Sequence, residues 1–348
     1  MKALFLYTEI ASYTEACFKT LAAKMELHVV KYPLNKEAPF VFSPVPNCTY
    51  YDRLQYQDPV ALGELCKTIN PDWVVVSGWV DKGYREVAKS FKKRVPVILT
   101  MDNFWQGSLK QYAWSFISPF YLRRIFTHIW VPGKPQVEYA KKLGFKDRQI
   151  KTGFYSADVD LYGHFYELSK DEKQNHFPHR FIYTGRYVPF KNIQLMCEAF
   201  VDAVNEKKSD WELWCTGTGE WWNQRIQHPQ INHIGFVQPC DMGKYIAQTG
   251  VFILPSLAEN WGVVVHEFAA AGFPLICSSR VGATSAFLQI DKNGFAFNPH
   301  NKDELKKIFV HVMAMNPAAL TAMGNCSRKL AAGITPETWA ETMMSFKL

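Results

Sequence analysis

The chain lacks the sequence patterns that mark several common classes of protein. No apolar run reaches the ~18 residues that a membrane-spanning helix requires. No G-x-G-x-x-G follows the first expected strand, which argues against a nicotinamide-dependent oxidoreductase. No run of lysine and arginine, zinc-finger spacing or RNA-binding signature is present, so nucleic acid is not expected as a partner. The cysteines stand singly, away from metal-ligand spacing, which predicts reduced thiols in a cytoplasmic protein and no metal site.

Length and composition indicate how many domains the chain can form and which partners its charge suits. With 348 residues, of which 48% are hydrophobic, the chain is long enough for two domains with sizeable cores. Its formal net charge of +7 suits an anionic ligand or an anionic membrane surface, and equally a protein with neither partner. The first residues, MKALFLYTEI, are expected to form a strand and not a signal peptide.

Short apolar runs alternate with helical patterns along the first half of the chain. Strands are expected at 3–8, 27–31, 73–78, 95–101 and 128–131, with helices at 13–23, 59–67, 81–92 and 135–142. This alternation predicts βαβ units and a parallel, doubly wound sheet. Residues 163–179 are polar and aperiodic, and the alternation of strand and helix patterns then resumes at Phe181. We therefore expect an α/β protein with two Rossmann-like domains facing across a cleft, at 1–162 and 180–335, joined by a linker at 163–179.

The segment from Pro255 to Gly272 carries the most informative functional pattern. Residues 251–254 have the character of a buried strand, and residues 262–271 that of a small-residue helix. A strand, a turn and a helix N-terminus in that order form the anion-binding edge of an open α/β sheet. The backbone N–H groups of Gly262, Val263 and Val264 are therefore expected to point at a phosphate.

Two glutamates, Glu259 and Glu267, lie in this segment with seven residues between them. Glutamates are common as solvated charges on α/β proteins, so the spacing alone does not favour a function. Glu267, however, stands among apolar residues, where a buried carboxylate needs a partner. A pair of ribose hydroxyls is one such partner.

Arg186 and Lys191 follow the strand expected at 181–184. Arginine offers a planar fork of donors and lysine a mobile point charge, and both suit phosphate. Taken alone, they would be two solvated residues in a loop. The glycine-opened helix and the glutamate pair in the same domain favour the phosphate-binding role for these two cations.

Five segments, in this order, resemble the signatures of one large family. The resemblance is to the retaining, GT-B-fold glycosyltransferases with a glutamate-x7-glutamate motif, of the group 1 or family 4 type. The segments are Phe181–Asn192 with its G-R-x-x-x-x-K pattern, Leu213–Gly219 with a G-x-G turn, His233–Val237, Glu259–Pro274 and Asp291–Phe295, a turn before a closing hairpin.

The resemblance implies a GT-B architecture and a sugar transfer. A UDP- or GDP-sugar would be the donor, and a glycan or lipid-linked molecule the acceptor, in synthesis of a cell-surface polysaccharide or glycolipid. Transfer would proceed with retention, and neither cofactor nor metal is expected. The last helix, at 336–348, would cross back to the first domain.

The resemblance also implies roles for individual residues. Glu267 would hold the ribose hydroxyls, and Glu259 would contact the hydroxyls of the sugar and stabilise positive charge at its anomeric carbon. Phe236 and Val237 would border the base. The remaining residues of the expected site are Arg186 and Lys191 as catalytic cations, and Gly185, Asn260, Gly262, Val263 and Val264 in donor binding.

The chain departs from the family pattern in its first half. The loop at 8–13 contains no glycine where relatives often have a glycine-rich loop. Asp102 stands where relatives often have a histidine, and it would either orient the sugar or act as a base, or cap a helix. Asp158 and Asp160 form a D-x-D like the metal motif of a different transferase fold. Asp158 instead matches an aspartate of the present family, although Ser156 replaces the glycine that precedes it.

Residues 112–131 are rich in aromatic side chains and include Arg123 and Arg124. This stretch is either an interfacial helix at the inner face of a membrane, which would suit a lipid-linked acceptor, or a core helix followed by a strand. Two other functions stay open. They are transfer to a soluble small molecule, and a non-catalytic or epimerase protein of the same fold that binds a sugar nucleotide.

Overall fold

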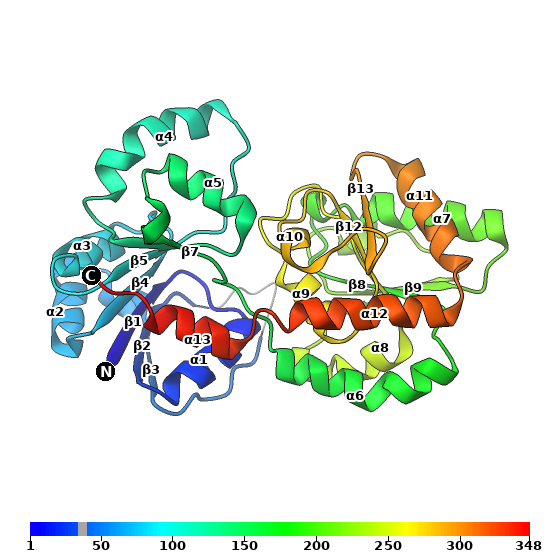
Figure 1. The fold of residues 1–348 in the computed structure, drawn as a ribbon, viewed down its shortest axis with the longest axis horizontal. Coiled ribbons are helices and arrows are strands. Elements are labelled where there is room, and N and C mark those ends of the chain that lie inside the picture. The colour runs from blue at the N-terminus through cyan, green and yellow to red at the C-terminus, as the bar shows by residue number, and fades with distance from the viewer. Residues whose placement is uncertain (34–39) are drawn as a thin grey trace. The chain divides into compact units, whose positions relative to one another are not determined.

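The computed structural model describes residues 1–33 and 40–348, which form two compact units (Figure 1). The first unit comprises Met1–Ser156 together with Ile334–Leu348, and the second comprises Ala157–Gly333. Each unit has its own parallel sheet with helices packed against it.

The first unit is built on a seven-stranded parallel sheet with the order β3-β2-β1-β4-β5-β6-β7. Its strands are β1 Lys2–Tyr7, β2 Glu26–Lys31, β3 Cys48–Asp52, β4 Trp73–Ser77, β5 Val97–Thr100, β6 His128–Trp130 and β7 Ile150–Lys151. Its helices are α1 Ser12–Ala22, α2 Pro59–Ile69, α3 Lys82–Phe91, α4 Leu109–Leu122, α5 Lys134–Lys142 and α13 Pro336–Met344, with short 3-10 turns η1 Arg53–Tyr56 and η2 Asp147–Gln149. The central strands β1, β4 and β5 are apolar apart from their end residues, because helices cover both faces of such a sheet.

The C-terminal helix α13 belongs to the first unit. Trp339 is buried there, stacked on Phe5 with ring centroids 6.1 Å apart, and its Nε1 donates to the Phe154 carbonyl oxygen at 2.7 Å. The indole of Trp73 likewise donates to the Phe346 carbonyl oxygen at 3.0 Å. The end of the chain is therefore part of the core of this unit.

The second unit has a six-stranded parallel sheet with the order β10-β9-β8-β11-β12-β13. Its strands are β8 Arg180–Thr184, β9 Glu212–Thr216, β10 Ile231–Gly235, β11 Val251–Leu254, β12 Leu275–Ser278 and β13 Gly294–Phe297. Its helices are α6 Val159–Asn175, α7 Ile193–Lys207, α8 Gly243–Gln248, α9 Val263–Ala270, α10 Thr284–Phe287, α11 Lys302–Met313 and α12 Pro317–Ala331, with 3-10 turns η3 Pro189–Lys191, η4 Trp222–Gln224 and η5 Pro239–Asp241. In its core, Phe252 of β11 stacks on Phe268 of α9 with centroids 4.4 Å apart.

Three details of the sequence prediction are wrong. Residues 163–179 are no linker, because helix α6 extends from Val159 to Asn175 and buries Tyr162, Phe165 and Ser169 on one face. The first unit accordingly ends at Ser156 and the second at Gly333, not at 162 and 335. The turn at 291–295 leads into a strand that pairs in parallel with β12, not into a hairpin.

Candidate active site

The order of strands in the second unit defines where a ligand would bind. β8 lies between β9 and β11, so the chain moves outward in one direction from β8 to β10 and in the other from β11 to β13. Open α/β sheets bind ligands at the carboxyl ends of the strands where this reversal occurs. The two segments that leave this point are 185–192 after β8 and 255–262 after β11, and they contain most of the predicted residues.

Lys191 and Glu259 form an ion pair that joins these two segments. The Lys191 ammonium contacts Glu259 Oε2, and their side chains are only 11% and 18% exposed. Ser256 Oγ donates to the same carboxylate oxygen at 3.3 Å. A second link is made by Asn192, whose Nδ2 donates to the carbonyl oxygens of Pro255 and Pro299 at 3.2 and 2.8 Å. The structure thus brings two of the predicted catalytic residues into direct contact.

The backbone of Glu259 is fixed by the segment that follows β12. Its N–H donates to the Arg280 carbonyl oxygen at 3.1 Å, and its own carbonyl oxygen accepts from Gly282 N at 3.0 Å. These bonds form an isolated parallel bridge between Glu259 and Val281. The carboxylate is therefore held on a braced segment and not on a free loop.

Arg186 lies in the same segment as Lys191, and both cations lie near the ring of Phe190. The Arg186 guanidinium carbon is 5.9 Å and the Lys191 ammonium nitrogen 5.8 Å from the ring centroid. The Arg186 carbonyl oxygen also accepts from the Tyr183 hydroxyl at 3.0 Å, which ties the segment to β8. Two positive groups therefore gather at the switch point of the sheet.

A close backbone approach places this segment against the G-x-G turn after β9. Gly217 has φ +113°, and a Cβ built on it would lie 2.0 Å from the Gly185 carbonyl oxygen. Gly185 N donates to the Thr216 carbonyl oxygen at 3.1 Å, and Tyr187 N to that of Thr218 at 2.9 Å. A side chain at 217 would push the two segments apart, so the glycine is required for the path of 185–191.

Helix α9 starts at the same edge, on a left-handed glycine. Gly262 has φ +91°, and a Cβ there would lie 3.0 Å from Glu259 Cγ. The helix begins at Val263, so the first amides, including those of Val263 and Val264, have no partner inside the helix. The glycine lets the helix N-terminus lie directly against the Glu259 side chain.

Glu267 lies one turn further along α9, half-buried beside Tyr162 of α6. Burial raises the pKa of Glu267 to about 7, although the hydrogen bond from Tyr162 lowers it; the charge of Asp158 adds to the rise. The predicted solvent-poor setting of this carboxyl is therefore confirmed by its position. Removal of a carboxyl from water disfavours its charged form, which is why the pKa rises.

The histidine before Glu267 holds α9 in place. His266 is fully buried, its Nδ1 accepts from Ala157 N at 3.0 Å, and its Nε2 donates to the Ala331 carbonyl oxygen at 3.0 Å. Its ring stacks on Phe287 with centroids 4.1 Å apart. The imidazole thus ties α9 to the first residue of this unit and to the end of α12.

The predicted base-binding residues lie at the outer part of the same edge. Phe236 and Val237 follow β10, both partly exposed, and β10 is two places from β8 in the sheet. Neighbouring strands are about 4.8 Å apart, so these residues lie about 10 Å along the edge from the cations. Asn260 lies in the segment of Glu259 and is partly exposed. The predicted donor residues are thus spread along one edge, in keeping with an elongated ligand.

Asp102 belongs to the first unit, just after β5. The Tyr155 hydroxyl donates to Asp102 Oδ2 in a long contact of 3.4 Å, and the ring of Tyr13 meets Tyr155 edge-on at 5.5 Å. Burial raises the pKa of Tyr155, with smaller contributions from Tyr13 and Asp102. Asp102 does not cap the next helix, because α4 is capped by Ser108, whose Oγ accepts from Gln111 N at 3.3 Å.

Asp158 has a structural place at the start of α6. Its side chain caps the helix by accepting from Leu161 N at 3.0 Å. Within residues 1–33 and 40–348, no group of three or more His, Cys, Asp or Glu side chains is arranged to hold a metal ion.

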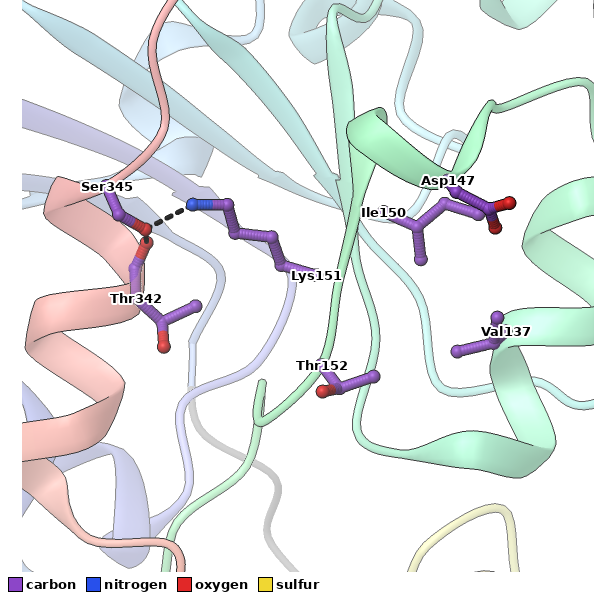
Figure 2. A pocket seen from close by; sticks show the side chains of 7 residues that line it. All are labelled: Val137, Asp147, Ile150, Lys151, Thr152, Thr342 and Ser345. Atoms are coloured by element: carbon purple, nitrogen blue, oxygen red, sulfur yellow. Dashed lines mark hydrogen bonds between the residues drawn. The ribbon is translucent and has the colours of Figure 1, made fainter.

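A separate hollow of about 420 Å³ lies in the first unit, and none of the predicted site residues lines it (Figure 2). It is open to solvent and is lined by residues of α5, β7 and α13, among them Val137, Lys151 and Thr342. On one side of the hollow, the Lys151 ammonium donates to Ser345 Oγ. The hollow carries no cluster of groups suited to catalysis.

The sequence analysis missed two side chains that shape the site. Ser256 is fully buried beneath Glu259, and its position three residues before that glutamate is the only signal it leaves in the sequence. Tyr162 hydrogen-bonds Glu267 from a distant part of the chain, so no local pattern could have indicated it.

Comparison with known proteins finds a family match within the second unit. Residues 178–314 match the family model described as "Glycosyl transferases group 1". Alpha-monoglucosyldiacylglycerol synthase of Acholeplasma laidlawii is 34% identical over 90 residues, which are 26% of this chain and 22% of that protein. The chain therefore aligns with about a fifth of the length of this relative, and the match supports the domain and not the whole protein's activity.

Solved structures match over nearly the whole chain. HepE of Anabaena in complex with UDP and glucose gives a TM-score of 0.73 at 15% identity, covering 99% of this chain and all (100%) of that one. Sucrose-phosphate synthase of Thermosynechococcus elongatus gives 0.73 at 16% identity, covering 99% and 97%. Both have two parallel-sheet, Rossmann-like α/β domains, as this chain does. Residues 178–314 are thus similar to the group 1 glycosyl transferases, and the chain as a whole has the GT-B fold.

Proposed function

We propose that the protein is a glycosyltransferase that moves a sugar from a UDP- or GDP-sugar to a glycan or lipid-linked acceptor, with retention at the anomeric carbon. The observation that carries the proposal is the Lys191–Glu259 pair at the switch point of the second sheet, within the matched domain. A buried cation beside a carboxylate, at the anion-binding edge of an α/β sheet, suits a sugar attached to a diphosphate.

The diphosphate would be bound by Lys191, Arg186 and the first amides of α9. Lysine has three N–H donors, so the ammonium can keep Glu259 and still donate to a phosphate oxygen. Arg186 adds a second positive charge from the same segment. These fixed charges would stabilise the negative charge that develops on the β-phosphate as the bond to the sugar breaks.

The rest of the donor would extend along the edge towards β10. The Glu267 carboxylate would accept hydrogen bonds from the two ribose hydroxyls, and Phe236 and Val237 would border the base. Gly185, Asn260 and Gly262 would line the path of the ligand. HepE of Anabaena, which has the same fold, is known in complex with UDP and glucose.

The reaction breaks the bond between the anomeric carbon and the β-phosphate oxygen, and forms a bond from the acceptor oxygen to the same face of the sugar. The proton of the acceptor hydroxyl passes to the departing phosphate oxygen, so no protein nucleophile takes part. Glu259 would stabilise the positive charge of the oxocarbenium-like transition state. Asp102, after β5 of the first unit, would orient the sugar or, as the alternative to the phosphate oxygen, take the proton of the acceptor hydroxyl.

Our proposal for the class of acceptor rests on the names of the relatives and on the net positive charge of the chain. The relative from Acholeplasma is named for a diacylglycerol product, whereas the structural relative from Thermosynechococcus is named for a phosphorylated sugar. We favour a lipid-linked or glycan acceptor at the cytoplasmic face of a membrane; transfer to a soluble sugar is the alternative that the test must distinguish.

Thermal-shift screening with UDP-, GDP- and ADP-sugars tests the donor, because a ligand that binds the native state raises the melting temperature. The preferred donor is then incubated with candidate acceptors, and the anomeric configuration of the product is determined by NMR. Retention of configuration is the expected outcome. Inversion would refute the mechanism, and an isomerised donor without transfer would identify an epimerase.

A further inference from the structure

Helix α4 of the first unit presents its apolar side to solvent. The exposed fractions are 88% for Leu109, 80% for Phe116 and 71% for Phe120, and Tyr112 and Ile117 are 57% and 56% exposed. Residues seven and four apart, as 109, 116 and 120 are, share one face of a helix. Figure 1 shows α4 at the periphery of its unit, with no other helix or strand of the described part of that unit outside it. A surface helix normally has the opposite arrangement, with polar side chains outward.

The opposite face of α4 fixes the helix in this orientation. Ser118 and Leu122 are fully buried, and Trp114 stacks on Trp79 with centroids 6.0 Å apart. Pro119 lies so close to Gly144 that a Cβ on the glycine would be 2.6 Å from the proline Cβ. The apolar face is therefore held outward by packing on the inside, and rotation of the helix would break these contacts.

The charged residues of α4 and of the chain on either side of it are all positive. No aspartate or glutamate occurs between Asp102 and Glu138. Lys110, Arg123 and Arg124 are exposed on or next to α4. An apolar stripe flanked by cations and free of acids matches the interface of a bilayer with anionic headgroups.

We propose that α4 docks the protein on an anionic lipid bilayer. Leu109, Phe116 and Phe120 insert at the level of the acyl chain boundary, while Arg123 and Arg124 meet the phosphate groups. The helix lies in the plane of the interface, and none of the helices in the described part of the chain has the length and apolar character to cross a bilayer. We refer to the exposed side chains of Leu109, Tyr112, Phe116, Ile117 and Phe120 as the α4 face.

A second copy of the chain is a poorer occupant of this surface. A two-fold contact through the α4 face would bring the cations of the two copies, Lys110, Arg123 and Arg124, close to one another. The helix offers no carboxylate to pair with them, and buried unpaired charge is costly. Anionic lipid supplies the missing negative charge, which decides between the two occupants.

This inference goes beyond the proposed function, because docking requires no catalysis. Together with the proposed function, it would bring the transferase to the surface where lipid-linked acceptors are found. The link to lipid-linked acceptors rests on the proposed function, so docking and donor binding are measured separately in the experiment below.

The test is co-sedimentation of the full-length chain with extruded vesicles. One set is pure phosphatidylcholine, and the other contains about one third phosphatidylglycerol. The wild-type protein is expected to sediment with the anionic vesicles and to be released by salt, since screening weakens the contribution of the cations. The double substitution Phe116→Ser/Phe120→Ser should lower the partition coefficient on the order of 100-fold, from the loss of two inserted rings.

Two further variants serve as a control for exposed apolar side chains elsewhere and as a test of the two arginines. Val60→Ser/Leu168→Ser removes two apolar side chains that are 65% and 72% exposed elsewhere, and it should bind vesicles as the wild type does. Arg123→Gln/Arg124→Gln should lower binding to anionic vesicles about 30-fold, with no change in its weak binding to phosphatidylcholine. All variants should keep the wild-type melting temperature and its shift with the donor.

Three results would overturn the proposal. They are a wild-type protein that stays in solution with both kinds of vesicle, binding that persists undiminished in Phe116→Ser/Phe120→Ser, and a wild-type dimer that this substitution dissociates in sedimentation equilibrium. Vesicle binding without any donor shift would instead refute the proposed function and leave the docking surface intact.

Discussion

Substitution of Lys191 tests whether the Lys191–Glu259 ion pair has a catalytic role or only a structural one. In Lys191→Met the side chain keeps a similar length but loses its charge, and Glu259 is left with the Ser256 hydroxyl as a hydrogen-bond donor. Breaking a buried pair by removing one partner costs about 3–5 kcal/mol. Because the two side chains are still 11% and 18% exposed, we expect a loss of about 2 kcal/mol in the free energy of unfolding.

The effect on catalysis has a different origin. An ammonium about 4 Å from a phosphate charge contributes about 4 kcal/mol at an effective dielectric constant of about 20. Allowing for the exposed fraction of Lys191, we expect Lys191→Met to lose about 3 kcal/mol of transition-state stabilisation, which lowers kcat/KM on the order of 100-fold.

The double variant Lys191→Met/Glu259→Gln decides between the two roles. Removing both charges leaves no unpaired carboxylate, so stability should return to within about 1 kcal/mol of the wild type. Activity should not return, because the cation for the phosphate is still missing. Unfolding is followed by urea titration and transfer by release of the nucleoside diphosphate, with Lys207→Met as the exposed control. Recovery of activity together with stability would show that the pair only holds the fold.

The remaining predictions concern Glu267 and two glycines, one in each unit. The donor should bind more weakly as the pH falls below about 7, because protonation of Glu267, whose raised pKa is about 7, removes the acceptor for the ribose hydroxyls, and Glu267→Gln should flatten this dependence in calorimetric titrations. Donor binding at pH 6 should also release a proton from Glu267, so the measured heat of binding should vary with the ionisation enthalpy of the buffer. Gly217→Ala should destabilise the protein by at least about 2 kcal/mol, because its Cβ would lie 2.0 Å from the Gly185 carbonyl oxygen at φ +113°. Gly63→Ala, where a Cβ meets nothing within 4 Å inside α2, should instead stabilise it by about 0.5–1 kcal/mol. Equal melting temperatures for the two alanine variants would contradict the packing described for the G-x-G turn.

The sequence was most informative where strands are short, apolar and buried on both faces. The βαβ alternation predicted the parallel sheets, and the segments after β8 and β11 were identified before their adjacency in the sheet was known. The position of Lys191 against Glu259 follows from that adjacency, since β8 and β11 are neighbours. Sequence spacing alone could not supply it, because these strands are far apart along the chain.

The failures have equally local causes. Helix α6 looked like a linker because its surface is polar, although Tyr162, Phe165 and Ser169 recur at helical spacing and Asp158 caps its start. The edge strand β3 was missed, since its residues are mostly exposed and show no buried run. The sequence of α4 is compatible with both a core helix and an interfacial helix. Its apolar residues proved to face outward, because Ser118, Pro119 and Leu122 occupy the inner side.

Calorimetric titration of the protein with UDP, GDP and ADP in the presence of EDTA tests the central claim most directly. The claim is that the second unit binds a nucleoside diphosphate through Lys191, Arg186 and the start of α9, without a divalent ion. One nucleotide should bind with an affinity that EDTA leaves unchanged, and Lys191→Met/Glu259→Gln should weaken it at least tenfold. No binding of any of the three, or binding that EDTA abolishes, would contradict the claim.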